Sequence, residues 1–391
     1  MPSFAIKVTE KQNPDEVNEI EKWTSCQSMN KPRALFGATA IGEKIYIAGG
    51  YNYDDDWYHS SAEVYDTKLN AWSPLPDMNE KREGCAVTSV GGKVYAVGGW
   101  HGDDDDWLSS CEMFDPDTNE WDTIPDMKEA RYDCAACTIG DKFYVIGGLN
   151  DREGWLSSAK AFDTVTQKWS SLPNMTTSRR GCAAVSVGNK IYVFGGNGDC
   201  IDTFSSAEVY DTISRVWTKL PQMMSTRMHC AATAVGNKIY IVGGSDGSAD
   251  HSSCEVFDIS RNTWSSPIPD MSEKREQCQA ISIGPQIFVM GGAKCVTSIS
   301  SVEVFEISMY SLYPTEDNYV TVENEYRSPK LLENLCVDQI CRSLPNLDGS
   351  LPPGIPEYII NDIFKSLINH DALNATALKA LRLYQLNELE L

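Results

Sequence analysis

Short apolar runs that end in a glycine pair recur along the first three quarters of the chain. The run KIYIAGG at 44–50 is typical: it is too short for a helix and is followed by a polar loop, so it predicts a buried strand that ends in a turn. The glycine pairs follow one another at spacings of 49, 49, 48, 48 and 48 residues, at 49–50, 98–99, 147–148, 195–196, 243–244 and 291–292. This spacing indicates one structural unit that is copied six times.

Three further features keep the same period and predict the other strands of the unit. A second strand, SSAEVYD in the first unit, begins at Ser60, Ser109, Ser157, Ser205, Ser252 and Ser300. A third strand carries a tryptophan, at Trp23, Trp72, Trp121, Trp169, Trp217 and Trp264, and a Met-x3-Arg motif recurs from Met29 and Arg33 to Met271 and Arg275. With a fourth run such as GCAVTSV, each unit predicts four short antiparallel strands.

One four-stranded unit cannot bury both of its faces, whereas radial repetition around a channel protects the sheet edges. The glycine pair has a role in such packing because residues without Cβ let a bulky ring approach the backbone closely. The repeated tryptophan is the expected occupant of that space.

The glycine pair, the tyrosine shortly before it and the phased tryptophan resemble the signature of the kelch family. The tyrosines are Tyr46, Tyr95, Tyr144, Tyr192 and Tyr240, with Phe288 in the last unit. The resemblance implies an all-β six-bladed kelch β-propeller over residues 23–310. It leaves an N-terminal extension at 1–22, a linker at 311–327 and a small α-helical module at 328–391.

Trp23 is in phase with the other five tryptophans but precedes the first glycine pair. We therefore expect the segment around Trp23 to be the outer strand of the last blade, which would close the ring. The segment after Glu306 is the alternative, but Leu312 stands there at the position of the tryptophan.

Charge restricts the partners. The chain has 33 Lys+Arg against 55 Asp+Glu, a net charge of −22, which argues against nucleic acid and anionic membranes as partners. No apolar run approaches the ~20 residues that span a bilayer, and the first residues, MPSFAIKVTEKQ, lack the apolar core of a secretory signal. We expect the protein in the cytosol or the nucleus.

Five of the 13 cysteines repeat one position of the unit, at Cys85, Cys134, Cys182, Cys230 and Cys278. Equivalent positions of a propeller lie a blade apart, so we expect free, buried thiols rather than disulfides. The sequence indicates no cofactor.

The loops between the glycine pair and the second strand differ in the first three units, where they read YNYDDDWYH, WHGDDDDWL and LNDREGWL. In kelch substrate receptors these loops and the residues just after the repeat arginine line the ligand-binding face. The resemblance implies a client-binding set of Tyr51, Tyr53, Asp54, Asp55, Trp57, Glu83, Trp100, Asp104, Asp105, Trp107, Tyr132, Arg152, Trp155, Arg180, His229 and Gln277. Aromatic residues beside clustered acids predict a protein client with a basic segment. The alternative is that the loops are merely solvated, with the tryptophans packed beneath them.

Catalysis and metal binding have weak support. Four histidines map to this face, at His59, His101, His229 and His251, and Asp55-x3-His59 has ligand-like spacing. No histidine pair has zinc spacing and no nucleophile stands near a base, so we expect neither a catalytic nor a metal site.

The C-terminal segment changes to a helical pattern. Ser328-Pro329 is a good helix start, and Leu332, Cys336 and Ile340 after it resemble the BC box that binds elongin C. Leu351, Pro352 and Ile355 resemble the cullin-contacting motif of VHL-box receptors. The resemblance implies elongin B, elongin C and a cullin as partners. The alternative is a helix that packs on the propeller.

These features favour a non-catalytic substrate receptor of a cullin-RING ubiquitin ligase. A kelch scaffold for cytoskeletal or signalling partners is the alternative, and a kelch-propeller enzyme is the third hypothesis.

Overall fold

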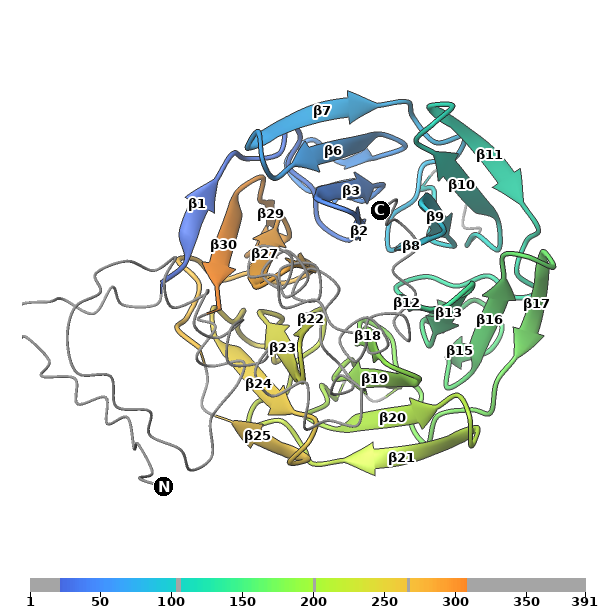
Figure 1. Cartoon of the computed structure of the whole chain (residues 1–391), viewed down its shortest axis with the longest axis vertical. Helices are drawn as coiled ribbons and strands as arrows, with labels where there is room; N and C mark the ends of the chain where they lie inside the picture. The colour runs from blue at the N-terminus through green and yellow to red at the C-terminus, as the bar shows by residue number, and fades with distance from the viewer. Residues whose placement is uncertain (1–21, 103–106, 200–201, 266–267, 308–391) are drawn as a thin grey trace, which may run out of the picture. The chain divides into compact units, whose positions relative to one another are not determined.

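Six four-stranded antiparallel sheets stand around a central channel (Figure 1). The computed structural model describes residues 22–102, 107–199, 202–265 and 268–307, and this part of the chain holds strands and turns but no helix. The all-β six-bladed propeller is thereby confirmed. The expected helical module at 328–391 lies outside the described residues. Within the four described ranges there is also no helix that is long and apolar enough to cross a membrane.

The blades follow one another in chain order, each with its first-named strand at the channel. Blades one to three are β2 (Gly37–Ile41), β3 (Lys44–Ala48), β6 (Ala62–Asp66) and β7 (Ala71–Leu75); β8 (Ala86–Val90), β9 (Lys93–Val97), β10 (Cys111–Asp115) and β11 (Glu120–Ile124); and β12 (Ala135–Ile139), β13 (Lys142–Ile146), β16 (Ala159–Asp163) and β17 (Lys168–Ser171). Blades four to six are β18 (Ala183–Val187), β19 (Lys190–Phe194), β20 (Ala207–Asp211) and β21 (Val216–Leu220); β22 (Ala231–Val235), β23 (Lys238–Val242), β24 (Cys254–Asp258) and β25 (Thr263–Ser265); and β26 (Gln279–Ile283), β27 (Gln286–Met290), β30 (Val302–Glu306) and β1 (Thr24–Cys26).

Three loops between the second and third strands of a blade form short hairpins of their own. They are β4 (Tyr51–Asn52) with β5 (Trp57–Tyr58), β14 (Leu149–Asn150) with β15 (Gly154–Trp155), and β28 (Ala293–Lys294) with β29 (Thr297–Ser298).

The sequence unit and the blade are offset by one strand. The run GCAVTSV, which we grouped with the tryptophan strand before it, contributes β8, and β8 pairs with β9 of the next sheet, Ala86 opposite Val97. The grouping was wrong because the chain crosses from the outer edge of one blade to the channel side of the next. There the following apolar strand is the hydrogen-bonding neighbour.

The two ends of the propeller meet in the sixth sheet. Strand β1 pairs with β30, Thr24 opposite Val304, and takes the outer position of that sheet (Figure 1). The Trp23 ring lies 5.3 Å from that of Phe305. The strand before the first glycine pair therefore closes the ring.

Each repeat tryptophan ties its blade to the preceding one through its indole Nε1–H. The acceptor is the backbone carbonyl two residues before the repeat methionine, as in Trp121 to Pro76 at 2.9 Å and Trp23 to Pro269 at 2.8 Å. The other four bonds are Trp72 to Gln27, Trp169 to Pro125, Trp217 to Pro173 and Trp264 to Pro221. These six bonds form a closed outer ring.

The tryptophan does not fill the space beside the glycine pair, contrary to expectation. It is on the outer strand and packs on the aromatic ring of the third strand, with 5.0 Å between the ring centroids of Tyr65 and Trp72. A Cβ on Gly49 would lie 2.4 Å from the carbonyl oxygen of Arg82, and one on Gly50 would lie 2.7 Å from that of Ala34. The backbone of the blade-to-blade connections occupies that space.

The repeat arginines join successive blades and are fully buried. The backbone of Arg82 bonds to blade one: its N–H donates to the His59 carbonyl and its carbonyl accepts from Gly50 N–H, at 3.0 and 2.7 Å. Its guanidinium bonds to blade two, donating to the Gly98 carbonyl at 2.8 Å and to Glu112 at 3.0 Å. The arginine also donates to the second serine of the SS pair, which explains why that second serine recurs.

Blade three lacks the glutamate of this network. Lys160 stands at the position of Glu112, and its ammonium pairs with Glu129 at 2.9 Å instead. Arg131 keeps its bonds to the Gly147 carbonyl and to Ser158. The six connections are therefore alike in geometry but not in charge.

The phased cysteines are free thiols. Cys85, Cys182, Cys230 and Cys278 are buried, as expected, whereas Cys134 is partly exposed, contrary to expectation. Burial raises the pKa of Cys85 to about 11 and that of Cys182 to about 12. Such thiols are protonated and unreactive at neutral pH.

The arginine network predicts unequal costs of one substitution in two blades. Arg82→Met leaves Glu112 buried without a countercharge and should cost about 3 kcal/mol or more. Arg131→Met loses the same bonds to backbone and serine but leaves no glutamate without its partner. Its loss of unfolding free energy should therefore be smaller by about 1–2 kcal/mol. Urea unfolding of the two variants measures the difference, and equal losses would show that the glutamate is not part of the energetics.

Ring closure predicts that removal of residues 1–30 is destabilising. The deletion takes away β1, Trp23 and the buried Met29, leaves the sixth sheet with an open edge, and should cost about 3 kcal/mol or more. Thermal unfolding of the truncated and full chains makes the comparison. Equal melting temperatures would contradict the role of this closure in stability.

Candidate functional site

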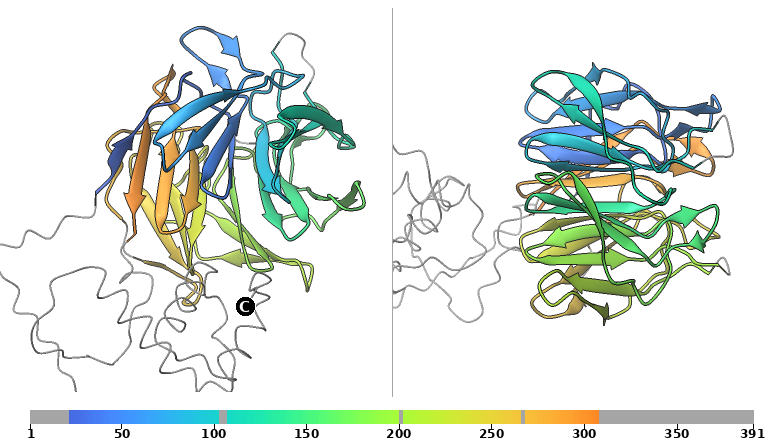
Figure 2. Two further views of the ribbon diagram at one scale, coloured as in Figure 1. Left: turned by 45° about the horizontal axis from the view of Figure 1, so that its top comes forward. Right: turned by 90° about the vertical axis from the view of Figure 1, so that its right-hand side faces the viewer.

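The loops between second and third strands and the blade-to-blade connections meet on one side of the ring, which we call the loop face. Isolated β-bridges join them in every blade: Ala34 with Tyr51, Glu83 with Trp100, Tyr132 with Leu149, Arg180 with Asn197, Met228 with Ser245, and Glu276 with Ala293. Figure 2 shows these loops and their hairpins on the same side of the sheets. The predicted residues after the repeat arginine thus lie beside the predicted loops.

A ring of backbone hydrogen bonds surrounds the channel at this face. The second residue after each arginine donates its N–H to its counterpart in the preceding connection, at 2.7 to 3.3 Å. All six residues have φ between 51° and 62°, the left-handed conformation that aims each amide at its neighbour. We call this ring the channel mouth; it consists of Leu35, Gly84, Asp133, Gly181, His229 and Gln277.

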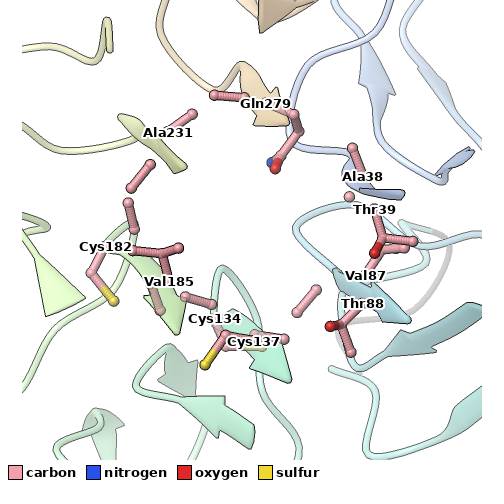
Figure 3. Close-up of a pocket in the computed structure, with 18 of the residues that line it drawn as sticks. Ala38, Thr39, Val87, Thr88, Cys134, Cys137, Cys182, Val185, Ala231 and Gln279 are labelled. Atoms are coloured by element: carbon pink, nitrogen blue, oxygen red, sulfur yellow. The ribbon is translucent and has the colours of Figure 1, made fainter. Parts of the chain in front are cut away.

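Below the channel mouth the inner strands line a cavity of about 290 Å³. Its walls carry small side chains such as Ala38, Thr88 and Val185, and Gln279 points toward the centre (Figure 3). The amide of Gln279 donates to the Phe36 carbonyl at 2.8 Å. Small side chains and an amide that is bonded to a neighbouring backbone carbonyl therefore line the channel.

Two glycines make room for larger side chains at the channel mouth. A Cβ on Gly84 would lie 2.5 Å from the Tyr132 ring, and one on Gly181 would lie 2.6 Å from the His229 imidazole. Tyr132 and His229 can lie across the connections beside them because these two positions carry no side chain.

His229 forms an ion pair across the channel mouth. Its Nε2 lies 2.9 Å from Asp133 and its Nδ1 lies 3.7 Å from Glu276. Burial lowers the pKa of His229, but the charges and hydrogen bonds of Asp133 and Glu276 more than offset this and raise the pKa to about 10. The imidazolium thus links its own connection to that of Asp133, two blades earlier, and to that of Glu276, one blade later.

Glu83 is buried beside this pair, with 7% of its surface exposed. Its carboxylate accepts a hydrogen bond from the Tyr132 hydroxyl at 2.9 Å. Burial raises the pKa of Glu83 to about 7, the Tyr132 hydrogen bond lowers it, and the charge of Asp133 raises it. This carboxyl therefore titrates near neutral pH.

Four aromatic residues of blades one and two form a continuous group, which we call the aromatic tract: Tyr53, Tyr51, Tyr58 and Trp100. Neighbouring ring centroids along it are 4.9, 4.8 and 5.3 Å apart. Tyr58 was not among the predicted residues, although it stands in the same aromatic loop. Its ring faces Gly102, where a Cβ would lie 2.5 Å away.

The remaining tryptophans of the three loops differ in exposure. Trp57 is 53% exposed, with the Lys81 ammonium 4.9 Å from its ring centroid. Trp107 is partly buried and stacks on Tyr132 at 6.1 Å. Trp155 is also partly buried and lies under the Arg180 guanidinium at 5.7 Å. Some tryptophans therefore pack within the face, and Trp57 is available to a partner.

Several predicted residues also hold the loop of blade one in place. Asp54 accepts a hydrogen bond from Ser298 N–H of blade six at 3.2 Å, and the Tyr53 hydroxyl donates to Gln277 at 3.1 Å. Asp55 accepts from the Asn52 amide at 2.8 Å. The contacts of Asp54 and Tyr53 join blades one and six across the point of ring closure, and the sequence offers no local signal for them.

The other predicted residues are dispersed or lie outside the described part. Arg152 has a side chain that is 89% exposed and lies 3.9 Å from Asp151. Outside the described residues are Asp104, Asp105, Leu332, Cys336, Ile340, Leu351, Pro352 and Ile355. Across the described ranges, no group of three or more His, Cys, Asp or Glu side chains is placed to hold a metal ion.

Comparison with known proteins identifies one family. The model of the KLHDC2/KLHL20/DRC7 Kelch-repeats domain matches residues 15–148 and 133–337, more than half of the chain. No curated protein matches the sequence.

Glu83 predicts a pH-dependent stability difference. Its pKa is raised from 4.5 to about 7, so the stability it contributes is complete below pH ~4.5 and is lost as the pH rises through 7. Glu83→Gln keeps the acceptor for Tyr132 without the charge. It should match the wild type at pH 4 and exceed its free energy of unfolding by roughly 3 kcal/mol at pH 8, since the pKa shift is about 2.5 units and one unit corresponds to about 1.4 kcal/mol.

Denaturant unfolding at the two pH values measures this difference. The exposed Glu80 of the same connection supplies a matched control, because Glu80→Gln removes the same charge from a solvated site. Parallel pH profiles for wild type and Glu83→Gln would contradict the prediction.

Proposed function

The chain belongs to the family of KLHDC2/KLHL20/DRC7 kelch-repeat domains, and on that premise we propose that it is a non-catalytic substrate receptor of a cullin-RING ubiquitin ligase. A kelch propeller is suited to binding proteins. In this proposal the loop face binds the client and the C-terminal segment binds the ligase. The assembly would act in the cytosol or the nucleus.

The observation that carries the client-binding role is the aromatic tract with the exposed Trp57 beside it. Large rings at a surface supply contact area at low conformational cost, and aromatic anchors dominate the energetics of many interfaces. Asp54, Asp55 and Asp56 stand in the same loop, and Glu83 forms a β-bridge with Trp100 of the tract. The charge favours a basic client segment.

The ligase role is supported by the sequence of the C-terminal segment. The proposed contacts with elongin C are Leu332, Cys336 and Ile340, and those with a cullin are Leu351, Pro352 and Ile355. Elongin B would join through elongin C. The order of a client-binding propeller followed by a BC-box-like segment matches the task of a receptor that delivers a client.

A scaffold for cytoskeletal or signalling partners is the alternative, because the same loop face serves either role. The two hypotheses differ in the use of Leu332 and Cys336. A receptor offers them to elongin C, whereas a scaffold packs them within the protein.

Substitution of Leu332 and Cys336 tests the proposal. Leu332→Gln with Cys336→Ser should abolish capture of elongin B and C from a eukaryotic lysate and leave the melting temperature of the propeller unchanged. For a scaffold, the same change would lower stability by roughly 2–5 kcal/mol, as when large apolar side chains are lost from a core. A wild-type chain that captures no elongin would refute the ligase role.

The matched control changes the loop face instead. Asp104→Asn, Asp105→Asn and Trp107→Ala together should lower the affinity for the client and leave elongin capture intact. The loss of affinity should be larger at low salt, where the screening of charges is least.

A further inference from the structure

Glu83 differs from the other buried glutamates of the propeller. Five of them occupy the same position in the third strand of their blades, and each forms an ion pair with a buried repeat arginine. They are Glu63, Glu112, Glu208, Glu255 and Glu303. Glu83 is almost equally buried, yet within the described part of the chain it forms no ion pair, and its hydrogen bond comes from the neutral Tyr132. A buried carboxylate without a countercharge is costly.

The surroundings of Glu83 add negative charge and aromatic surface. Burial raises the pKa of Tyr53, the hydrogen bond to Gln277 lowers it, and the charges of Glu83, Glu276 and Asp133 raise it, so Tyr53 lies in the field of three carboxylates. The Tyr132 ring stands beside Glu83 at the same place. Aromatic faces and carboxylates together favour a cation.

The cation already present at the channel mouth cannot neutralise Glu83. His229 lies 2.9 Å from Asp133 and 3.7 Å from Glu276, and among the described residues it makes no ion pair with Glu83. One imidazolium thus faces two carboxylates and leaves the third without a partner.

We propose that Glu83, beside the channel mouth, binds one cationic side chain of the client, a lysine or an arginine, between the rings of Tyr53 and Tyr132. This inference rests on the proposed client-binding role of the loop face and adds a specificity-determining residue to it. The cationic side chain of the client supplies the countercharge that Glu83 lacks among the described residues. A client with a neutral residue at that position leaves the carboxylate desolvated and is rejected.

The test presents peptides to the immobilised full chain. One random synthetic library has acetylated N-termini and a second has free N-termini, so that a side-chain cation is distinguished from a terminal amine. Wild type, Glu83→Gln and the matched control Glu80→Gln are compared, and circular dichroism checks that each is folded.

The proposal expects the wild type to enrich acetylated peptides with lysine or arginine at one fixed position. Glu83→Gln should lower the affinity for the best of them about tenfold or more, as for the loss of a desolvated charge pair, and should abolish the preference for a cation. Glu80→Gln should change the affinity less than about twofold, because an exposed charge contributes little.

Three results overturn the proposal. If peptides are enriched without a fixed cation, or if Glu83→Gln keeps the cation preference, Glu83 does not select the client, although the loop face still binds peptides. If only peptides with free N-termini bind through Glu83, the cation is a terminal amine and not a side chain. If the wild type enriches no peptide, the client-binding role of the loop face fails as well.

Discussion

A buried guanidinium is stable in a protein only when its donors are bonded, and this requirement organises the propeller. Each repeat arginine takes its backbone partners from one blade and its side-chain partners from the next. The glycine pair must be free of Cβ so that the arginine carbonyl can approach, and the second serine of the SS pair must offer its hydroxyl and carbonyl. The repeat arginine, the glycine pair and the second serine therefore recur together because they form one contact between blades.

Much of the fold could be predicted because its determinants recur at one fixed period. Six glycine pairs give six blades, and the phase of Trp23 points to the strand that pairs with β30. The offset between unit and blade could not be predicted, since a periodic sequence has no marked beginning. The prediction that the tryptophan fills the space beside the glycine pair was also wrong. The sequence does not show how far the tryptophan of an outer strand lies from the glycine pair.

The candidate site could be predicted only in part. Composition located the loop face, since aromatic and acidic residues gather in three loops. It could not show that Asp133 pairs with His229, 96 residues away, or that the hydroxyl of Tyr53 reaches Gln277, 224 residues away. Such contacts depend on the ring bringing distant connections together. Tyr58 was missed because its role depends on Gly102 of the next blade, which no local pattern reveals.

The union of β1 with β30 also has a consequence for biosynthesis. Strand β1 leaves the ribosome first, but its partner is made about 280 residues later, since Thr24 lies opposite Val304. Until β30 has been made, the nascent chain therefore carries Trp23 and one sheet edge without their partners, and this long-range pairing forms last. Closure of the ring therefore waits until all six blades have been made, and a chaperone that shields the first strand would act during that interval.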